Sequence, residues 1–423
     1  VPYWKGPAWP CPEPGLPSTR QNDREDEPRS SARPPAATVV RMPQFGRVVP
    51  EYASLRTATA PSSFWTNLYS GFLLAVVVGY FALMFFIAGE FLQWAYQLIR
   101  GAGSQPLWGT ILYLIGAAVL AVLLIRTVRH LIYACWGLVT PAHDLVPEAE
   151  EGIVVDRDEY PKLFALIDAV REAVDAPQPD EVRIHFGPEP GTFEMREFGI
   201  VTQRRLIMLL SLPQMGVFSE KEFGVILAHE LSHFGCGYTR LVVFLERFVN
   251  ALRTSVEGGG KHWWRWIDPI YWLQYVYLRM LILLTAPMQQ RQELRADSVS
   301  ASIFGGDVAA HTLLKNWLLG NQFLTAITSY EPGENGDDSE NVFEWFRSQW
   351  RDYTADGEDY LLRRLESLQT PSFWNDDPTI SQRVALMRKF PPRDAGTTRP
   401  VREVVEDLTP LEKQLHDMFL AAE

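Results

Sequence analysis

The sequence contains only three cysteines, and they lie far apart. Cys11, Cys135 and Cys236 form no pair at close spacing, and an odd number of this kind provides no disulfide framework and is typical of a reducing compartment. Basic residues are also in the minority: 39 lysines and arginines stand against 51 aspartates and glutamates, which leaves a formal net charge of -12. Because such a chain has no global positive field for phosphate backbones, we expect no nucleic-acid partner.

The first sixty residues lack any sustained apolar period. Proline recurs there at short intervals, and the charged run NDREDEPR interrupts the segment. We therefore expect residues 1–61 to be a disordered, proline-rich tail. The tail also lacks the basic start, apolar run and small-residue cleavage site of a secretory leader. No repeat and no phosphate-binding glycine motif is found in the rest of the chain.

Two long apolar runs follow the tail. Residues 68–91 carry only Glu90, and residues 107–125 carry no charge. Each run is long enough to cross roughly 30 Å of hydrocarbon at about 1.5 Å per residue, whereas core helices of soluble proteins seldom run so far without charge. Since only a short connection separates them, they predict a transmembrane hairpin over 62–130, followed by a linker over 131–150. The lipid bilayer is thus an expected partner.

Positive residues flank this hairpin unequally. Arg56 precedes the first span and Arg126 and Arg129 follow the second, whereas the turn holds only Arg100. Positive residues are enriched in short segments on the cytoplasmic side. We therefore expect both ends of the hairpin, and the domain that follows, to face the cytoplasm.

From residue 151 the sequence is typical of a domain with both helices and strands. Helical spacing of apolar residues predicts a helix over 159–174, and short apolar or alternating runs predict strands over 181–186 and 205–212. Between these two strands lies a candidate edge strand over 192–198. Further helices are expected over 240–253, 360–368 and 409–422. We expect a folded core over 151–321 and a helical, acidic extension over 322–423.

The segment 267–288 is apolar nearly all round, but Asp268 and Arg279 interrupt it. The clean apolar run within it is too short for a membrane span. We interpret it as part of a long helix in or near the membrane surface that leads to Glu293. A hairpin that re-enters the membrane is the alternative.

One predicted helix contains the motif HExxH. Ser219 and Glu222 form a capping box at its start, and His229, Glu230 and His233 follow. Two histidines four apart on a helix point the same way, as two imidazole ligands of a tetrahedral zinc must. Glu230, next to the first histidine, is close enough to take a proton from metal-bound water. A structural pair of histidines is the alternative interpretation.

A hydrolytic zinc site needs three protein ligands and one open position. Glu293 and Asp297 follow sixty residues after His233, four apart on another predicted helix. We expect one Zn2+ per chain, held by His229, His233 and Glu293, with Asp297 bonded to the outer nitrogen of His229. Considered alone, Glu293 would be a solvated carboxylate. Cys236 is either a fourth ligand or a small buried residue.

Three segments between residues 160 and 306 carry a family likeness: PKLFALID, RRLIMLLSLPQMGVFSEKEFGVILAHELSHF and ELRADSVSA. Together with the hairpin, they resemble the HtpX-like and CAAX-prenyl-protease-like membrane zinc metallopeptidases, which are gluzincins. The resemblance implies an α+β zincin-like catalytic domain, mostly helical, in a bacterial-type plasma membrane. It also implies that an edge strand, here near 192–198, binds an extended polypeptide. Gly-Thr-Phe stands there in place of the common Asn-Ala-Phe.

The same family carries a later His-Pro segment followed by arginine, which corresponds here to residues 377–383. Pro378 and Arg383 keep their places, but Asp377 stands where the family usually has histidine. Arg383 is a candidate catalytic residue that stabilises an oxyanion, or it pairs with Asp297 or another carboxylate. A surface arginine is the plain alternative.

These observations predict a zinc metalloendopeptidase that hydrolyses peptide bonds of membrane-associated or misfolded proteins through Glu230-assisted attack of zinc-bound water. A catalytically silent zinc-binding membrane scaffold of the same family is the first alternative. A membrane interaction protein with a chance motif is the second. The complete HExxH with its glutamate argues against a decayed site, since such a site usually loses its general base first.

Overall fold

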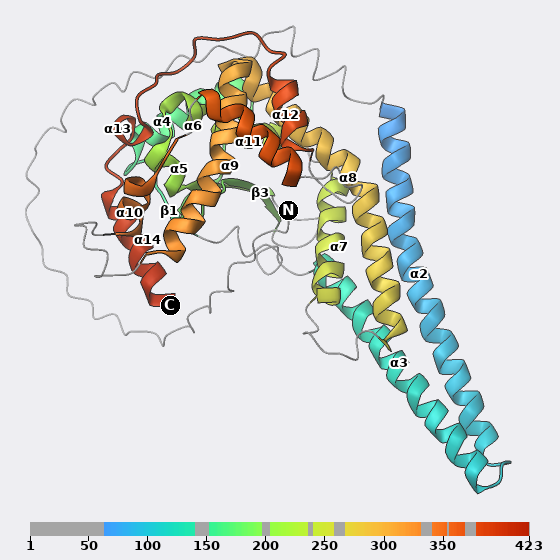
Figure 1. The fold of residues 1–423 in the computed structure, drawn as a ribbon. Helices are drawn as coiled ribbons and strands as arrows, with labels where there is room; N and C mark the ends of the chain where they lie inside the picture. The colour runs from blue at the N-terminus through green and yellow to red at the C-terminus, as the bar shows by residue number, and fades with distance from the viewer. Residues whose placement is uncertain are drawn as a thin grey trace, which may run out of the picture.

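The computed structural model describes residues 63–139, 152–196, 204–235, 240–257, 267–330, 341–352, 355–368 and 378–422. These residues are mostly helical and include one small mixed sheet (Figure 1). The tail over 1–61, Cys236 and Asp377 lie outside them, so the expectations for these positions stay predictions.

Two long helices form an antiparallel hairpin at the amino-terminal end of the described chain (Figure 1). They are α2 (Ser63–Ala102) and α3 (Leu107–Val139). Both are long and apolar enough to cross a membrane, over Gly71–Ala102 and Leu107–Trp136. Many of their apolar side chains are exposed, which is typical of helices that face lipid. The two expected spans lie inside these helices.

The helix α3 is longer than its apolar run. It continues to Val139, so the first part of the expected linker over 131–150 is helical. Leu131 and Ala134 explain the difference, because both are buried against neighbouring helices. The charges after Ile125 end the apolar run, but the inner face stays apolar, and packing there extends the helix.

Two further helices pack against the base of the hairpin and complete a four-helix bundle (Figure 1). They are α7 (Arg240–Glu257) and α8 (Pro269–Phe304). The bundle core contains Leu73, Val77, Tyr80, Met84, Leu131, Leu245, Phe248, Leu252, Leu278 and Leu281. The expectation of one long helix that carries Glu293 is confirmed, since α8 runs from the bundle into the folded domain, whereas its expected place in or near the membrane surface stays a prediction. It is not among the described helices apolar enough to span a membrane.

The sheet has the strand order β1-β2-β4-β3. Its strands are β1 (Ile153–Val154), β2 (Glu181–His185), β3 (Gly191–Arg196) and β4 (Arg204–Ser211). β2 and β4 are parallel, whereas β1 and β3 pair antiparallel at the two edges. The three predicted strands are confirmed, and the edge position of β3 agrees with the sequence.

The remaining helices cover the sheet and extend the domain. They are α4 (Pro161–Val174), α5 (Leu212–Val217), α6 (Glu220–Gly235), α9 (Gly306–Thr328), α10 (Val342–Gln349), α11 (Ala355–Leu368), α12 (Ile380–Met387), α13 (Val401–Val404) and α14 (Thr409–Ala422). The expected boundary between residues 321 and 322 falls inside α9. Moreover, Val342, Phe346 and Leu415 belong to the same core as α4 and the sheet. The expected extension over 322–423 therefore packs into the same domain, because its buried side chains lie against α9 and the main core.

Candidate metal centre

The helix α6 begins with the predicted capping box. The Ser219 backbone N–H and its hydroxyl each donate to Glu222 Oε2 over 2.8 Å, which satisfies a donor that the first turn leaves unpaired. Leu227, Ala228 and Leu231 are buried in the main core along this helix. This buried face fixes the rotation of α6 and turns His229 and His233 toward α8.

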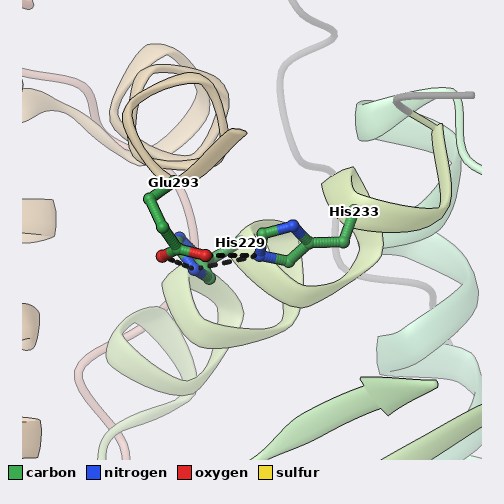
Figure 2. A group of neighbouring side chains, drawn as sticks. All are labelled: His229, His233 and Glu293. Carbon is green, nitrogen blue, oxygen red and sulfur yellow. Dashed lines mark hydrogen bonds and ion pairs between the residues drawn. The ribbon is translucent and has the colours of Figure 1, made fainter. Parts of the chain in front are cut away.

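Three nitrogen and oxygen atoms from α6 and α8 converge on one point (Figure 2). His229 Nε2 lies 3.3 Å from His233 Nε2. Glu293 Oε2 lies 3.4 Å from His229 Nε2, and Glu293 Oε1 lies 3.5 Å from His233 Nε2. Ligands that surround a metal tetrahedrally at about 2.0–2.1 Å are about 3.3 Å from one another. The three side chains are therefore spaced as the ligands of one small metal ion.

The three side chains remain partly accessible. The exposed fraction is 15% for His229, 13% for His233 and 22% for Glu293. Asp297, one turn beyond Glu293 on α8, is fully buried at 0%. The three ligand residues thus keep some contact with solvent, whereas the carboxylate behind them is sealed from water.

Asp297 and Arg383 form the outer layer of the site. Asp297 Oδ1 lies 3.1 Å from His229 Nδ1, so a proton on Nδ1 leaves the lone pair of Nε2 free for a metal. Arg383, on α12, donates from Nε and Nη2 to the two oxygens of Asp297, each over 2.7 Å. Its Nη2 also lies 3.4 Å from Glu293 Oε2. Of the roles considered for Arg383, the structure shows the ion pair with Asp297.

The electrostatics of the site favour a positive charge at the point of convergence. Burial disfavours protonation of His229, but hydrogen bonds to Asp297 and Glu293 outweigh it and raise the pKa of His229 to about 10. The pKa of Glu293 is lowered despite its burial, because His229 and Arg383 stabilise the carboxylate. Burial and the neighbouring His229 lower the pKa of His233 to about 4, which keeps it a neutral ligand. A single positive charge between these groups is thus stabilised by the carboxylates of Glu293 and Asp297.

Glu230 is held by a residue that the sequence pattern did not single out. Thr192 Oγ1, on the edge strand β3, donates to Glu230 Oε2 over 3.2 Å. Burial raises the pKa of the Glu230 carboxyl, which makes its carboxylate a better proton acceptor. The only sequence signal was that Gly-Thr-Phe stands near this strand in place of the Asn-Ala-Phe expected from the resemblance.

Two glycines let the helices of the site approach one another. A Cβ at Gly224 on α6 would lie 2.6 Å from the ring of Phe304, so only glycine allows α8 to pack this closely on the helix that carries the histidines. A Cβ at Gly306 would lie 2.2 Å from the carbonyl oxygen of Met387, the last residue of α12. These contacts set α8 between α6 and α12, which is how Arg383 reaches Asp297.

The chain was compared with protein-family models, with curated proteins and with solved structures, and it matches none of them. Any assignment of function therefore depends on the motifs and on the geometry of the site itself.

Proposed function

We propose that this chain is a zinc-dependent metalloendopeptidase anchored in the membrane by the hairpin of α2 and α3. The observation that carries the proposal is the spacing of His229 Nε2, His233 Nε2 and the Glu293 carboxylate, whose Oε2 lies 3.4 Å from His229 and whose Oε1 lies 3.5 Å from His233, with 3.3 Å between the two nitrogens. Two imidazoles and one carboxylate are a ligand set of hydrolytic zinc sites, which keep a fourth position for water or substrate.

The charge and the chemistry of these residues fit zinc better than calcium or magnesium. Three carboxylates, from Glu230, Glu293 and Asp297, face one guanidinium, from Arg383, so negative charge is in excess around the ligands. Calcium and magnesium prefer sites made almost entirely of oxygen, whereas two of the three converging atoms here are imidazole nitrogens. This donor set supports zinc as the resident ion.

Glu230 is the proton carrier of the proposed reaction. Zinc would polarise a peptide carbonyl and lower the pKa of water at the site. The Glu230 carboxylate accepts the proton of the attacking water and delivers it to the nitrogen of the leaving amine. Thr192 holds the accepting oxygen in place. Asp297 and Arg383 keep His229 in the tautomer whose Nε2 is free.

The edge strand β3 supports a polypeptide substrate. Within the described residues it pairs with β4 on one side only, and Thr192 brings it next to Glu230. An unpaired strand edge binds an extended peptide through backbone hydrogen bonds. A protein segment bound along β3 would therefore lie beside the metal ligands.

We also propose a location in a bacterial-type plasma membrane, with the domain on the cytoplasmic side. Arg126 and Arg129 lie near the base of the hairpin on α3, whereas Arg100 lies near its tip. This excess of positive charge on the domain side supports the orientation.

The decisive experiment compares the wild type with Glu230→Gln, both purified in detergent. We expect one zinc per chain in both by metal analysis and cleavage of casein by the wild type alone. Glu172→Gln, at a side chain that is 68% exposed on α4, is the matched control and should cleave normally. Zinc in both proteins without cleavage by either would instead support a silent scaffold, and a chain without zinc would refute the proposal.

A further inference from the structure

We infer that the bilayer encloses only the tip half of the hairpin, and that the proteolytic site therefore stands well above the lipid. The tip half is residues 107–125 of α3 with the part of α2 beside it. The base half is the part that packs with α7 and α8. It follows that the substrate is a water-exposed, extended segment and not a membrane-spanning helix. The statement about substrate rests on the proposed function, whereas the statement about the bilayer does not.

The hairpin is too long to lie in the hydrocarbon along its whole length. The helix α2 has 40 residues and α3 has 33. At about 1.5 Å per residue, α2 measures about 60 Å, roughly twice the 30 Å of a hydrocarbon core. Only one half of the hairpin therefore lies in lipid, and the packing and the charges decide which half.

The packing separates the two halves at Asp268, the N-cap of α8. Gln274, Tyr277 and Leu284 of α8 contact α2 at Tyr80, Val76 and Tyr69 in turn, so α8 runs antiparallel along the base half. Asp268 itself forms an ion pair with Arg126 on α3. Below this level the described part of the chain consists of the two helices of the hairpin alone (Figure 1). A bare two-helix hairpin needs lipid around it to bury its apolar surface.

The charges separate the halves in the same way. The base half holds Arg126, Arg129 and Arg279, in addition to Asp268. The tip half of α3 contains no charge at all. Charged side chains are costly in hydrocarbon, so the bilayer excludes the level at which these residues gather. Apolar exposure alone does not separate the halves, because the base of α2 also exposes apolar side chains.

The charges within the tip half of α2 fit the same placement. Tyr113 packs against Gly101, and Leu98 packs against Gly116, which fixes the register of the two helices. This register puts Glu90 close to the level of Arg126, and Arg100 lies in the last turn of α2. Both charges thus lie toward the ends of the tip half, where long side chains reach the membrane surface.

The length of the tip half matches the bilayer. From Leu107 to Arg126, α3 rises about 28 Å at roughly 1.5 Å per residue, against a hydrocarbon core of about 30 Å. The side chains in this range are open to the surroundings: Leu107 is 73% exposed, Leu112 68% and Ile125 66%. The residues directly before Ile267 read KHWWRW, a cationic and tryptophan-rich run typical of a membrane interface. The length of the uncharged run on α3 and the sequence before Ile267 both support an interface at Asp268 and Arg126.

The height of the site follows from α8. The helix runs beside α2 from Asp268 to Leu284, a rise of about 24 Å, and Glu293 comes nine residues later. The metal ligands therefore lie between about 25 and 37 Å above the interface. An extended chain at about 3.3 Å per residue needs roughly eight to eleven residues to cover that distance. A peptide bond inside a membrane-spanning helix, or directly beside it, cannot reach Glu230.

The level of the bilayer can be measured without any activity. In a chain with Cys11, Cys135 and Cys236 replaced by serine, single cysteines are introduced by Val78→Cys in the base half and Ile115→Cys in the tip half. Both positions are well exposed, at 59% and 56%. In proteoliposomes we expect a charged maleimide to label position 78 at least tenfold faster than position 115. Equal labelling, or protection of position 78, would overturn the inference.

The substrate class is tested with a series of membrane-anchored substrates in the same proteoliposomes. The cleavable segment is separated from the membrane-spanning helix by linkers of about 3, 8, 15 and 25 residues. We expect cleavage at least tenfold slower with the shortest linker than with the longest. Equal rates for all four would show that the site lies at the membrane surface. Failure to cleave every substrate, including soluble casein, would refute the peptidase function and leave the labelling result to decide the bilayer level.

Discussion

Arg383 donates two hydrogen bonds of 2.7 Å to the two carboxylate oxygens of Asp297, a residue with no exposed surface. This bidentate pair joins α12 to α8 behind the metal ligands, and Asp297 in turn contacts His229 Nδ1. The position of the His229 imidazole thus depends on Arg383 through Asp297, although Arg383 lies ninety positions after the ligand Glu293 in the sequence.

Replacing Arg383 by alanine should weaken metal binding and destabilise the domain. Asp297 would keep a buried charge without its partner, and breaking such a pair costs about 3–5 kcal/mol. Loss of an outer partner of a ligand lowers metal affinity by about 10–100-fold. Competitive zinc titration and thermal unfolding measure the two effects. Lys389→Ala, at an exposed position just after the same helix, is the control and should change neither.

The metal-free chain should be most stable near pH 6.5. The pKa of His229 is raised from 6.5 to about 10, so the folded chain binds more protons than the unfolded chain in this interval and stability falls as pH rises through it. The pKa of His233 is lowered from 6.5 to about 4, so stability falls as pH drops from 6.5 to 4. Unfolding in chelator across this range measures both limbs. In Asp297→Asn the loss of stability above pH 6.5 should be smaller. An unchanged loss would contradict its assignment to His229.

The affinity for zinc should depend on the protonation of His229. Zinc and the extra proton compete for His229, so affinity should increase up to about tenfold per pH unit between pH 7 and about 9. Competitive titration at several pH values measures it, together with the number of protons released. An affinity independent of pH would show that His229 carries no such proton.

The first half of the site is predictable from sequence because it is local. Residues four apart on a helix lie on one face whatever the tertiary structure, so His229 and His233 needed only the assignment of a helix. The same holds for Glu293 and Asp297 on α8. What joins the two pairs is an approach of α6 and α8 that depends on side-chain size at Gly224, and no spacing rule gives it.

The rest of the site depends on contacts between distant segments. Thr192 reaches Glu230 only because β3 pairs with β4 in one register, with Thr192 opposite Met208. A slip of one residue would turn this hydroxyl to the other face of the sheet. The pairing of Arg383 with Asp297 likewise depends on tertiary packing, here of α12 on α8. For the same reason, composition alone did not show that α3 continues to Val139, since buried contacts at Leu131 and Ala134 extend it beyond its apolar run.

Thr192→Val should lower kcat while leaving KM and zinc content unchanged. The substitution keeps the shape of the side chain but removes the hydroxyl that holds Glu230 Oε2, and one hydrogen bond of about 1.4 kcal/mol corresponds to about tenfold in rate. Thr192→Ser keeps the hydroxyl and should retain most of the activity. If valine and serine variants lose activity equally, packing and not the hydrogen bond is what matters at this position.

A last prediction separates close packing from helix propensity within α9. Gly306→Ala places a Cβ 2.2 Å from the Met387 carbonyl oxygen and 2.6 Å from that of Phe390, and backbone atoms cannot rotate away. Overpacking of this kind costs about 1–3 kcal/mol, so we expect a lower Tm. It also pushes α12 away from α8, so zinc affinity should fall together with stability. Gly320→Ala, in the same helix, meets nothing within 4 Å and should raise stability by about 0.5–1 kcal/mol. Changes of opposite sign from the same substitution in one helix would show that Gly306 is required by the approach of α12, and hence by the contact between Arg383 and Asp297.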